Sequence, residues 1–238
     1  MNRTATIVLL LLCSTFINAQ GLFKYFKWTA YTDGPEKVDH IVVDIKHDRF
    51  LQHPSGIEQS NYSVGANVYA FHDAPLNKKS TLSFGIGIGF SGSNYHNNGR
   101  FAYSAGQDNT LTTQFLPYPD ELDIRKNKLN LNFLEIPLEL RIRSWTRKVD
   151  QRIYPAFRLY LGFKGGYLIS NHTKFRDADT KIKEYNIKNL LQYRYGPTVR
   201  LGFKKISLFG FYSLTPVFQD GLGPKMFPIS FGVSWIRL

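Results

Sequence analysis

The feature that most constrains this chain is a strict two-residue alternation over residues 82–91. The apolar positions are Leu82, Phe84, Ile86, Ile88 and Phe90, and Gly or Ser fills every position between them. Because successive side chains of a β-strand point to opposite faces, this period predicts a strand. A soluble sheet usually carries charges on the face turned away from its core. Small residues instead suit the crowded interior of a narrow barrel whose apolar face meets lipid.

Seven other segments alternate in the same way and predict seven more strands. They lie at residues 41–46, 64–69, 134–143, 157–164, 195–203, 206–214 and 227–235. Pro197 removes one ladder donor, and aromatic residues occupy both faces of the segment from 206 to 214. These two features make their strands less regular without changing the predicted number.

The segment before Leu134 carries apolar residues in the other parity. Leu129, Leu131 and Phe133 are odd-numbered, whereas the apolar residues from Leu134 onward are even-numbered. A β-bulge near Phe133 and Leu134 would reconcile the two registers. We therefore expect a bulge in this strand.

The gaps between the predicted strands alternate in length. Long gaps cover residues 51–61, 94–125, 174–189 and 219–225, and short gaps cover residues 73–79, 144–152 and 204–205. Outer-membrane barrels have long extracellular loops and short periplasmic turns. The predicted fold is all-β: an eight-stranded antiparallel up-and-down transmembrane β-barrel with both termini in the periplasm. The alternative is a soluble sandwich of two sheets.

The N-terminus has the three parts of a secretory signal. Arg3 supplies the positive charge, the run from Ile7 to Leu12 is apolar, and cleavage is expected after Ala19. The alternatives are a membrane anchor, for which the apolar run is short, and a lipoprotein modified at Cys13. We expect a signal peptide at residues 1–19, a short leader at 20–37 and the barrel at 38–238. The mature chain then has no cysteine and is expected in the outer membrane of a Gram-negative-type cell.

The chain is basic, with a formal charge of +12, and removing Arg3 with the signal leaves +11. An exported protein rarely meets nucleic acid, so no nucleic-acid partner is expected. Outer-membrane lipids, including the phosphates of lipopolysaccharide, are the expected counter-charges. Basic loops that simply stay solvated are the alternative. The aromatic share of 15% and the mean hydropathy of −0.25 also suit a barrel with one apolar face and aromatic girdles.

Four motifs resemble one family in their order and spacing. They are "NFLEIPLELRIR" at residues 132–143, "YLGFKGGYLISNHT" at 160–173, "YRYGPTVRLGF" at 193–203 and "FYSLTPV" at 211–217. Together they are similar to the PorT-like outer-membrane barrel family of the Bacteroidetes type. The resemblance implies an outer-membrane β-barrel and leaves open a link to secretion or cell-surface function. The C-terminus departs from the usual insertion signal, because Leu238 is not aromatic and is out of phase with Trp235.

Charged residues occupy inward positions of several predicted strands. This predicted lumen charge network comprises Asp44, Lys46, Glu135, Glu139, Arg141, Arg143, Arg158, Lys164 and Arg200. A charge in a narrow lumen is strongly destabilising unless it is paired. We expect a plug of mutual salt bridges and therefore a structural or ligand-binding barrel. The alternative is a narrow channel for protons, ions or small solutes.

No catalytic, metal or cofactor site is expected. Glu135 and Glu139 would lie about 13 Å apart along one strand, too far to act on one bond. The six histidines form no HExxH spacing. Ser170 and His172 share a strand face, so a lipid-modifying hydrolase is the enzymatic alternative, although no orienting acid is identifiable.

Loop aromatics are the expected contacts for a protein partner or ligand. The candidates in the long gap after residue 94 are Tyr95, Phe101, Tyr103, Phe115 and Tyr118. Loops of this length are often binding surfaces, and an ordinary cover over the barrel mouth is the alternative. The segment from Lys174 to Lys188 mixes cations and carboxylates, which suits contact with lipopolysaccharide phosphates or plain solvation.

Overall fold

The computed structural model describes residues 41–77, 81–105, 110–119, 121–144, 146–149, 152–155, 157–203 and 206–237. The predicted signal peptide at residues 1–19 and the leader at 20–37 lie outside this part of the chain. Val38, the predicted first residue of the barrel, lies outside it too. Within the described residues, no helix is both long enough and apolar enough to cross a membrane.

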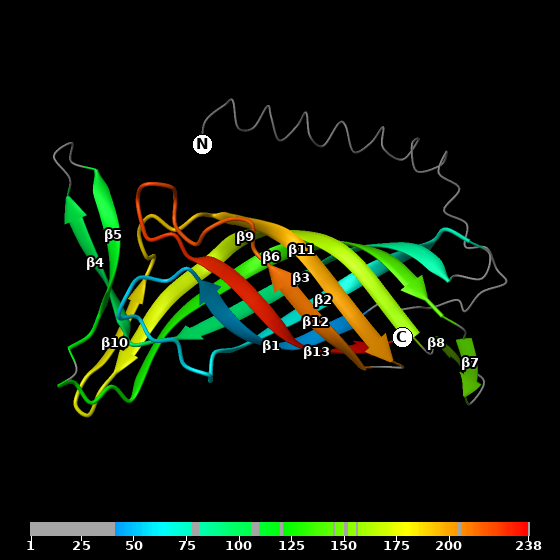
Figure 1. The fold of residues 1–238 in the computed structure, drawn as a ribbon, viewed down its shortest axis with the longest axis horizontal. Helices are drawn as coiled ribbons and strands as arrows, with labels where there is room; N and C mark the ends of the chain where they lie inside the picture. The colour runs from blue at the N-terminus through cyan, green and yellow to red at the C-terminus, as the bar shows by residue number, and fades with distance from the viewer. Residues whose placement is uncertain are drawn as a thin grey trace, which may run out of the picture.

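Eight long strands form one closed antiparallel ring (Figure 1). They are β1 (Ile41–Leu51), β2 (Val64–Pro75), β3 (Leu82–His96), β6 (Lys126–Arg143), β9 (Phe157–Arg176), β11 (Tyr193–Phe203), β12 (Ile206–Tyr212) and β13 (Phe227–Arg237). Each pairs with the next along the chain, and β13 pairs with β1 to close the ring. Because the ring is closed, each of these eight strands has a neighbour on both sides. Their backbone groups can therefore form hydrogen bonds with one another even in lipid. The predicted barrel is confirmed, and the sandwich alternative is wrong.

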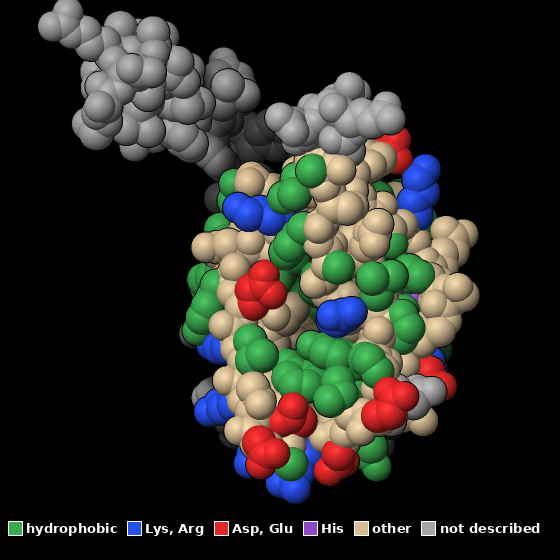
Figure 2. Space-filling model, turned by 90° about the vertical axis from the view of Figure 1, so that its left-hand side faces the viewer, with side chains coloured by type: hydrophobic (Ala, Val, Ile, Leu, Met, Phe, Trp, Pro, Cys, Tyr) green, Lys and Arg blue, Asp and Glu red, His purple; other side chains and the backbone are tan. Residues whose placement is uncertain are grey.

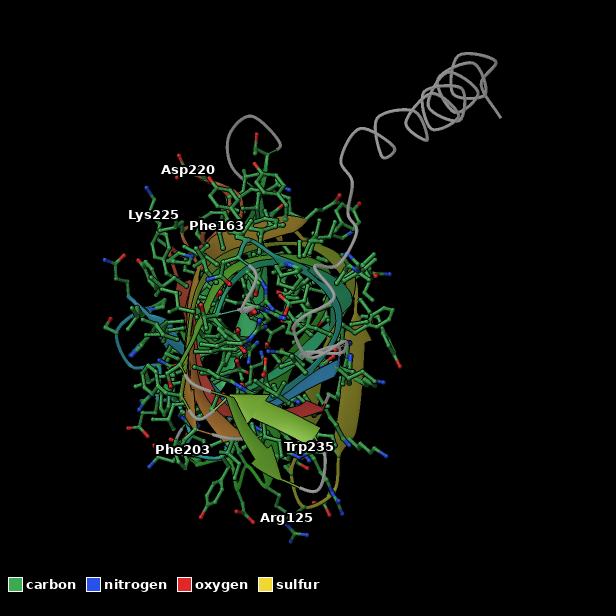
Figure 3. All side chains as sticks on the ribbon, turned by 90° about the vertical axis from the view of Figure 1, so that its right-hand side faces the viewer. Arg125, Phe163, Phe203, Asp220, Lys225 and Trp235 are labelled. Carbon is green, nitrogen blue, oxygen red and sulfur yellow. The ribbon has the colours of Figure 1, made fainter. Side chains whose placement is uncertain are left out.

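The alternation in the sequence matches the two faces of the wall. Figure 3 looks along the ring, with nitrogen and oxygen atoms gathered inside and Phe163, Phe203 and Trp235 on the outside. On β12, whose pattern was ambiguous, Phe209 and Phe211 turn inward and are buried. The outward side chains form an apolar belt, as a membrane-spanning barrel requires. On β6 this belt consists of Leu134, Ile136, Leu138, Leu140 and Ile142.

Five further strands lie beyond the ring at its two ends (Figure 1). At the long-loop end lie β4 (Gly99–Ala105), β5 (Leu111–Pro117) and β10 (Lys181–Tyr185), and at the short-turn end lie β7 (Thr146–Val149) and β8 (Arg152–Pro155). Four predicted gaps are wrong in extent. Three are shorter than predicted, because β2 continues to Pro75, β3 to His96 and β9 to Arg176, and the last is longer, because β12 ends at Tyr212. The strands are paired beyond the apolar belt, where the outward residues become polar and the membrane pattern ends.

The bulge lies on the strand opposite to the predicted one. Asn132 on β6 pairs with Ser170, and Phe133 pairs with Leu168, which leaves Ile169 of β9 as the extra residue. On β6 itself the alternation is unbroken, so Leu129, Leu131 and Phe133 point inward with Glu135. The change of parity on β6 marks a change in the interior, from charged to apolar, and not a change of register.

Candidate functional site

The centre of the interior is organised around Arg200 of β11. Its Nη1 lies 2.5 Å from Asp44 Oδ1 on β1, and its Nη2 donates to Asp44 Oδ2 at 3.1 Å. Its Nε donates to Glu139 Oε1 of β6 at 3.1 Å. The guanidinium also donates to Ser234 and lies over the Phe209 ring at 4.6 Å. All these polar groups are buried, so Arg200 joins its own strand to β1, β6 and β13 across the lumen.

A second group surrounds the buried carboxylate of Glu135. Lys164 Nζ lies 2.9 Å from Glu135 Oε2, and Arg194 Nη2 lies 2.7 Å from Oε1. The Tyr69 hydroxyl donates to the same carboxylate. Lys164 lies 4.0 Å from the centre of the Phe211 ring. The carboxylate thus contacts two cations and a phenol. One of these cations, Lys164, also has a cation–π contact with the Phe211 ring.

A third group lies nearer the short-turn end. Arg143 Nη2 approaches Asp73 Oδ2 at 2.5 Å, and its Nη1 donates to Ser83 at 2.7 Å. Arg141 Nη2 lies 2.9 Å from Glu139 Oε2. Glu139 therefore bridges this group to Arg200, so the first and third groups form one connected set of charges.

A fourth charged group is centred on β1. Lys46 Nζ donates to Asp48 Oδ1 and to Ser93, at 2.9 and 2.6 Å. Ser230 donates to the same Asp48 oxygen at 2.5 Å. Arg158, the remaining predicted lumen cation, is fully buried on β9.

The structure thus brings together the predicted lumen charges and adds three that sequence reasoning missed. The missed residues are Asp48, Asp73 and Arg194. Each has the inward parity of its strand and lies beyond the segment in which the alternation was read. Extending that parity by one or two steps would have found all three, because the period of a strand continues until its pairing stops.

An apolar plug lies between this charged interior and the long loops. Its buried members are Phe50, Ile57, Tyr95, Phe115, Leu129, Leu131, Phe133, Ile187, Leu190, Val217, Phe218 and Met226. The strands supply about half of them, and the loops supply the rest. Figure 2 views this end of the molecule, with hydrophobic side chains gathered near its centre and charged side chains mostly toward its rim. The charged interior therefore ends where the apolar plug begins, on the side toward the long loops.

The loops above the plug are joined by backbone hydrogen bonds. Thr113 N donates to Leu222 O at 2.8 Å, and Leu191 N donates to Val217 O at 2.9 Å. The Asn189 side chain joins two of these loops as well, because it donates to Leu111 O at 2.7 Å. We use the term loop crown for residues 51–63, 97–105, 110–119, 186–192 and 213–226 together. Its segments support one another, because each supplies hydrogen-bond partners to another.

The five candidate contact aromatics divide between the plug and the surface. Tyr95 stacks on Phe50 at 3.9 Å between ring centres, and Phe115 stacks on Phe101 at 4.8 Å, so these three lie in or against the plug. Tyr103 is exposed and donates to Glu184 at 3.3 Å. Tyr118 stacks on Phe175 at 4.6 Å. Of the five, Tyr95 and Phe115 are fully part of the plug, Phe101 is partly buried against it, and Tyr103 and Tyr118 lie outside it.

A groove of about 490 Å³ opens between the loop crown and the start of β6. Its lining comprises Glu58, Gln59, Ser60, Tyr62, His96, Asn97, Asn98, Ile124, Arg125, Lys126 and Asn127. The Asn127 side chain donates to Gly99 O at 2.6 Å and to Asn97 O at 2.9 Å, which fixes the floor. The lining is rich in amides, with one exposed phenol at its edge.

Ser170 and His172 lie on the outward face of β9. The His172 ring packs 5.6 Å from the Tyr185 ring, and no hydrogen bond joins it to Ser170 among the described residues. In the same part of the chain, no group of three or more His, Cys, Asp or Glu side chains could hold a metal ion.

Comparison with known proteins adds one match. A family model described as "outer membrane protein beta-barrel domain" matches residues 42–219, about three quarters of the chain. A search of curated proteins finds no match. The matched range begins on β1 and ends in the loop that precedes β13.

Proposed function

Because the chain belongs to the outer membrane protein β-barrel family, we propose that it is a closed binding barrel displayed at the cell surface. In this proposal the wall anchors the protein in the outer membrane and the loop crown meets a ligand or partner. The lumen passes no solute. Export through a cleavable signal and membership of the PorT-like branch belong to the same proposal, supported by the N-terminal pattern and the four motifs.

The single observation that carries the proposal is the double closure of the interior. Buried ion pairs fill the middle of the barrel, and the apolar plug fills the end toward the loops. An ion crossing this layer would lose its hydration shell without gaining polar partners, which costs many kcal/mol. The narrow-channel alternative has no support from the plug, and the hydrolase alternative has none from the placement of Ser170 and His172.

The orientation of the barrel provides the test. Tyr62 is exposed at the long-loop end, and Leu76 is exposed at the short-turn end. Cysteine is placed at one of these positions in a chain with Cys13→Ser, and intact cells are treated with a maleimide that cannot cross membranes. The proposal predicts labelling of Tyr62→Cys and protection of Leu76→Cys until the outer membrane is opened. Labelling of Leu76→Cys alone would reject a crown displayed at the surface.

A further inference from the structure

The outer wall above the apolar belt carries cations in register across three strands. We call the six residues Lys126, Lys128, Lys174, Arg176, Lys181 and Lys183 the basic face. Lys126 pairs with Arg176, which pairs with Lys181. Lys128 pairs with Lys174, which pairs with Lys183. Partners in a ladder point to the same side of the sheet, so the basic face consists of two parallel rows of three cations.

Two features place the basic face on the outside of the barrel. The alternate residues Asn127 and Leu129 of β6 are buried, and Phe175 of β9 is buried as well. The same register continues onto β3, where His96 pairs with Lys128. The cations therefore lie on the outer face of the barrel wall. Nearer the short-turn end, the same face carries the apolar belt.

Directly opposed like charges destabilise a sheet. No ion pair in the described part of the chain joins any of the six cations to a carboxylate. Glu184, the nearest acid in sequence on β10, has the opposite parity and accepts from Tyr103. Lys128 Nζ donates to the amide oxygen of Asn94 at 2.5 Å, which positions its charge without neutralising it. Lys183 Nζ also lies 4.4 Å from the centre of the Tyr185 ring, which likewise leaves its charge in place. The basic face is thus an array of charges without a carboxylate partner among the described residues, and it can accept anions from outside the fold.

The height of the basic face identifies the layer it meets. The apolar belt of β6 ends at Leu134, and Lys128 lies about 20 Å further along the strand. At the usual strand tilt this puts Lys128 about 15 Å above the belt. Phosphates carried on sugars lie in that layer when the lipid is a glycolipid with a large headgroup.

The groove between the loop crown and β6 adjoins the basic face. Lys126 belongs to both, and His96 and Arg125 line the groove next to it. The buried Nδ1 of His96 has no hydrogen-bond partner among the described residues. Amides, a histidine and an exposed tyrosine together match the hydroxyl groups and faces of sugar rings.

We propose that the basic face and the groove together bind the phosphorylated sugar headgroup of an outer-leaflet glycolipid of the lipopolysaccharide type. The phosphates lie on the cation rows, and a sugar ring occupies the groove. This inference rests on the proposed function, because the long-loop end must lie on the side of the outer leaflet.

The test uses the full barrel, folded in neutral detergent and immobilised, with lipopolysaccharide and chemically dephosphorylated lipopolysaccharide as probes. The test variant removes one row with Lys128→Gln, Lys174→Gln and Lys183→Gln. The matched control removes three exposed cations elsewhere, with Arg100→Gln, Lys188→Gln and Lys225→Gln, and has the same net charge. Each cation near an anionic surface contributes enough that the row variant should bind lipopolysaccharide about a hundredfold more weakly. The control should bind within about twofold of the unmodified barrel.

Equal losses in the two variants would overturn the inference, because they would reduce it to net charge. Unchanged binding in the row variant would overturn it too. Inorganic phosphate at matched phosphate concentration distinguishes a lipid from a free anion: it should fail to compete, and full competition contradicts a glycolipid site. In the groove, His96→Ala should weaken binding of both the phosphorylated and the dephosphorylated probe, and no effect on either removes the sugar contact.

Thermal unfolding in neutral detergent separates binding from structure. Removing a row of mutually repelling cations should leave the melting temperature unchanged or raise it, and a lower value would make the row structural. Failure of the surface-labelling test would reject the proposed function without changing these affinities, so the two failures are distinguishable.

Discussion

Arg200 and Asp44 form a two-point ion pair across the lumen, from β11 to β1, with both side chains buried. Their strands are separated in the ring by β12 and β13. The pair therefore spans the lumen between strands that are not neighbours in the ring, and its distances depend on the closure of the ring.

Asp44→Asn should destabilise the barrel by about 3 kcal/mol, because it leaves a buried guanidinium short of a charge partner. Urea unfolding in lipid vesicles, followed by tryptophan fluorescence, measures this loss. The control is Asp220→Asn, which breaks the exposed Lys225–Asp220 pair of 3.2 Å and should leave the midpoint unchanged. Equal midpoints for both variants would contradict a network that stabilises the barrel.

Glu135 and Arg194 should be energetically coupled. The carboxylate accepts from Arg194 Nε at 2.9 Å and also holds Lys164, so removing either partner changes the charge balance seen by the other. A double-mutant cycle with Glu135→Gln and Arg194→Gln should give a coupling free energy of about 1–3 kcal/mol. Additive effects within experimental error would show that the two groups do not act together.

The apolar plug should contribute to stability as a packed core does. Leu131→Ala removes a side chain that is 2% exposed and should destabilise the barrel by about 2–5 kcal/mol. Leu116→Ala is the control, since Leu116 on β5 is 38% exposed and lies outside the buried cluster. If both variants unfold at the same denaturant concentration, the plug is loosely packed.

Gly89 is required by close approach of the chain inside the barrel. A Cβ at this position would lie 2.1 Å from the carbonyl oxygen of Val68, a backbone atom that cannot move alone. Gly89→Ala should therefore reduce the yield of folded, heat-modifiable protein on gels. Gly165→Ala is matched in chemistry, but its Cβ would meet nothing within 4 Å, so it should fold normally. Normal folding of both variants would mean that the lumen tolerates more volume than its packing indicates.

The wall of the barrel was predictable because alternation reports directly which face each residue takes. The inward position of Arg200 follows from its parity alone. Its partner does not, because Asp44 is far away in sequence and only the closed ring brings them together. The same parity rule predicts that Arg194 points inward, but the alternation was read only over residues 195–203, so this residue was missed.

The plug was not predictable from the pattern. Leu129 and Leu131 have the inward parity, but an inward leucine contradicts the polar lumen expected of a membrane barrel. The pattern therefore favours a change of register over an apolar layer in the interior. The basic face was equally hidden, since Lys128, Lys174 and Lys183 belong to three different strands and only their pairing aligns them.

The most direct test of the central claim is electrical recording of the purified barrel in planar bilayers. A lumen filled with ion pairs and capped by hydrocarbon predicts no steady conductance at any applied voltage that the bilayer survives. A steady conductance whose ion selectivity changes in Arg200→Gln or Glu139→Gln would contradict a closed lumen, because the current would then pass along the buried ion pairs and through the apolar plug.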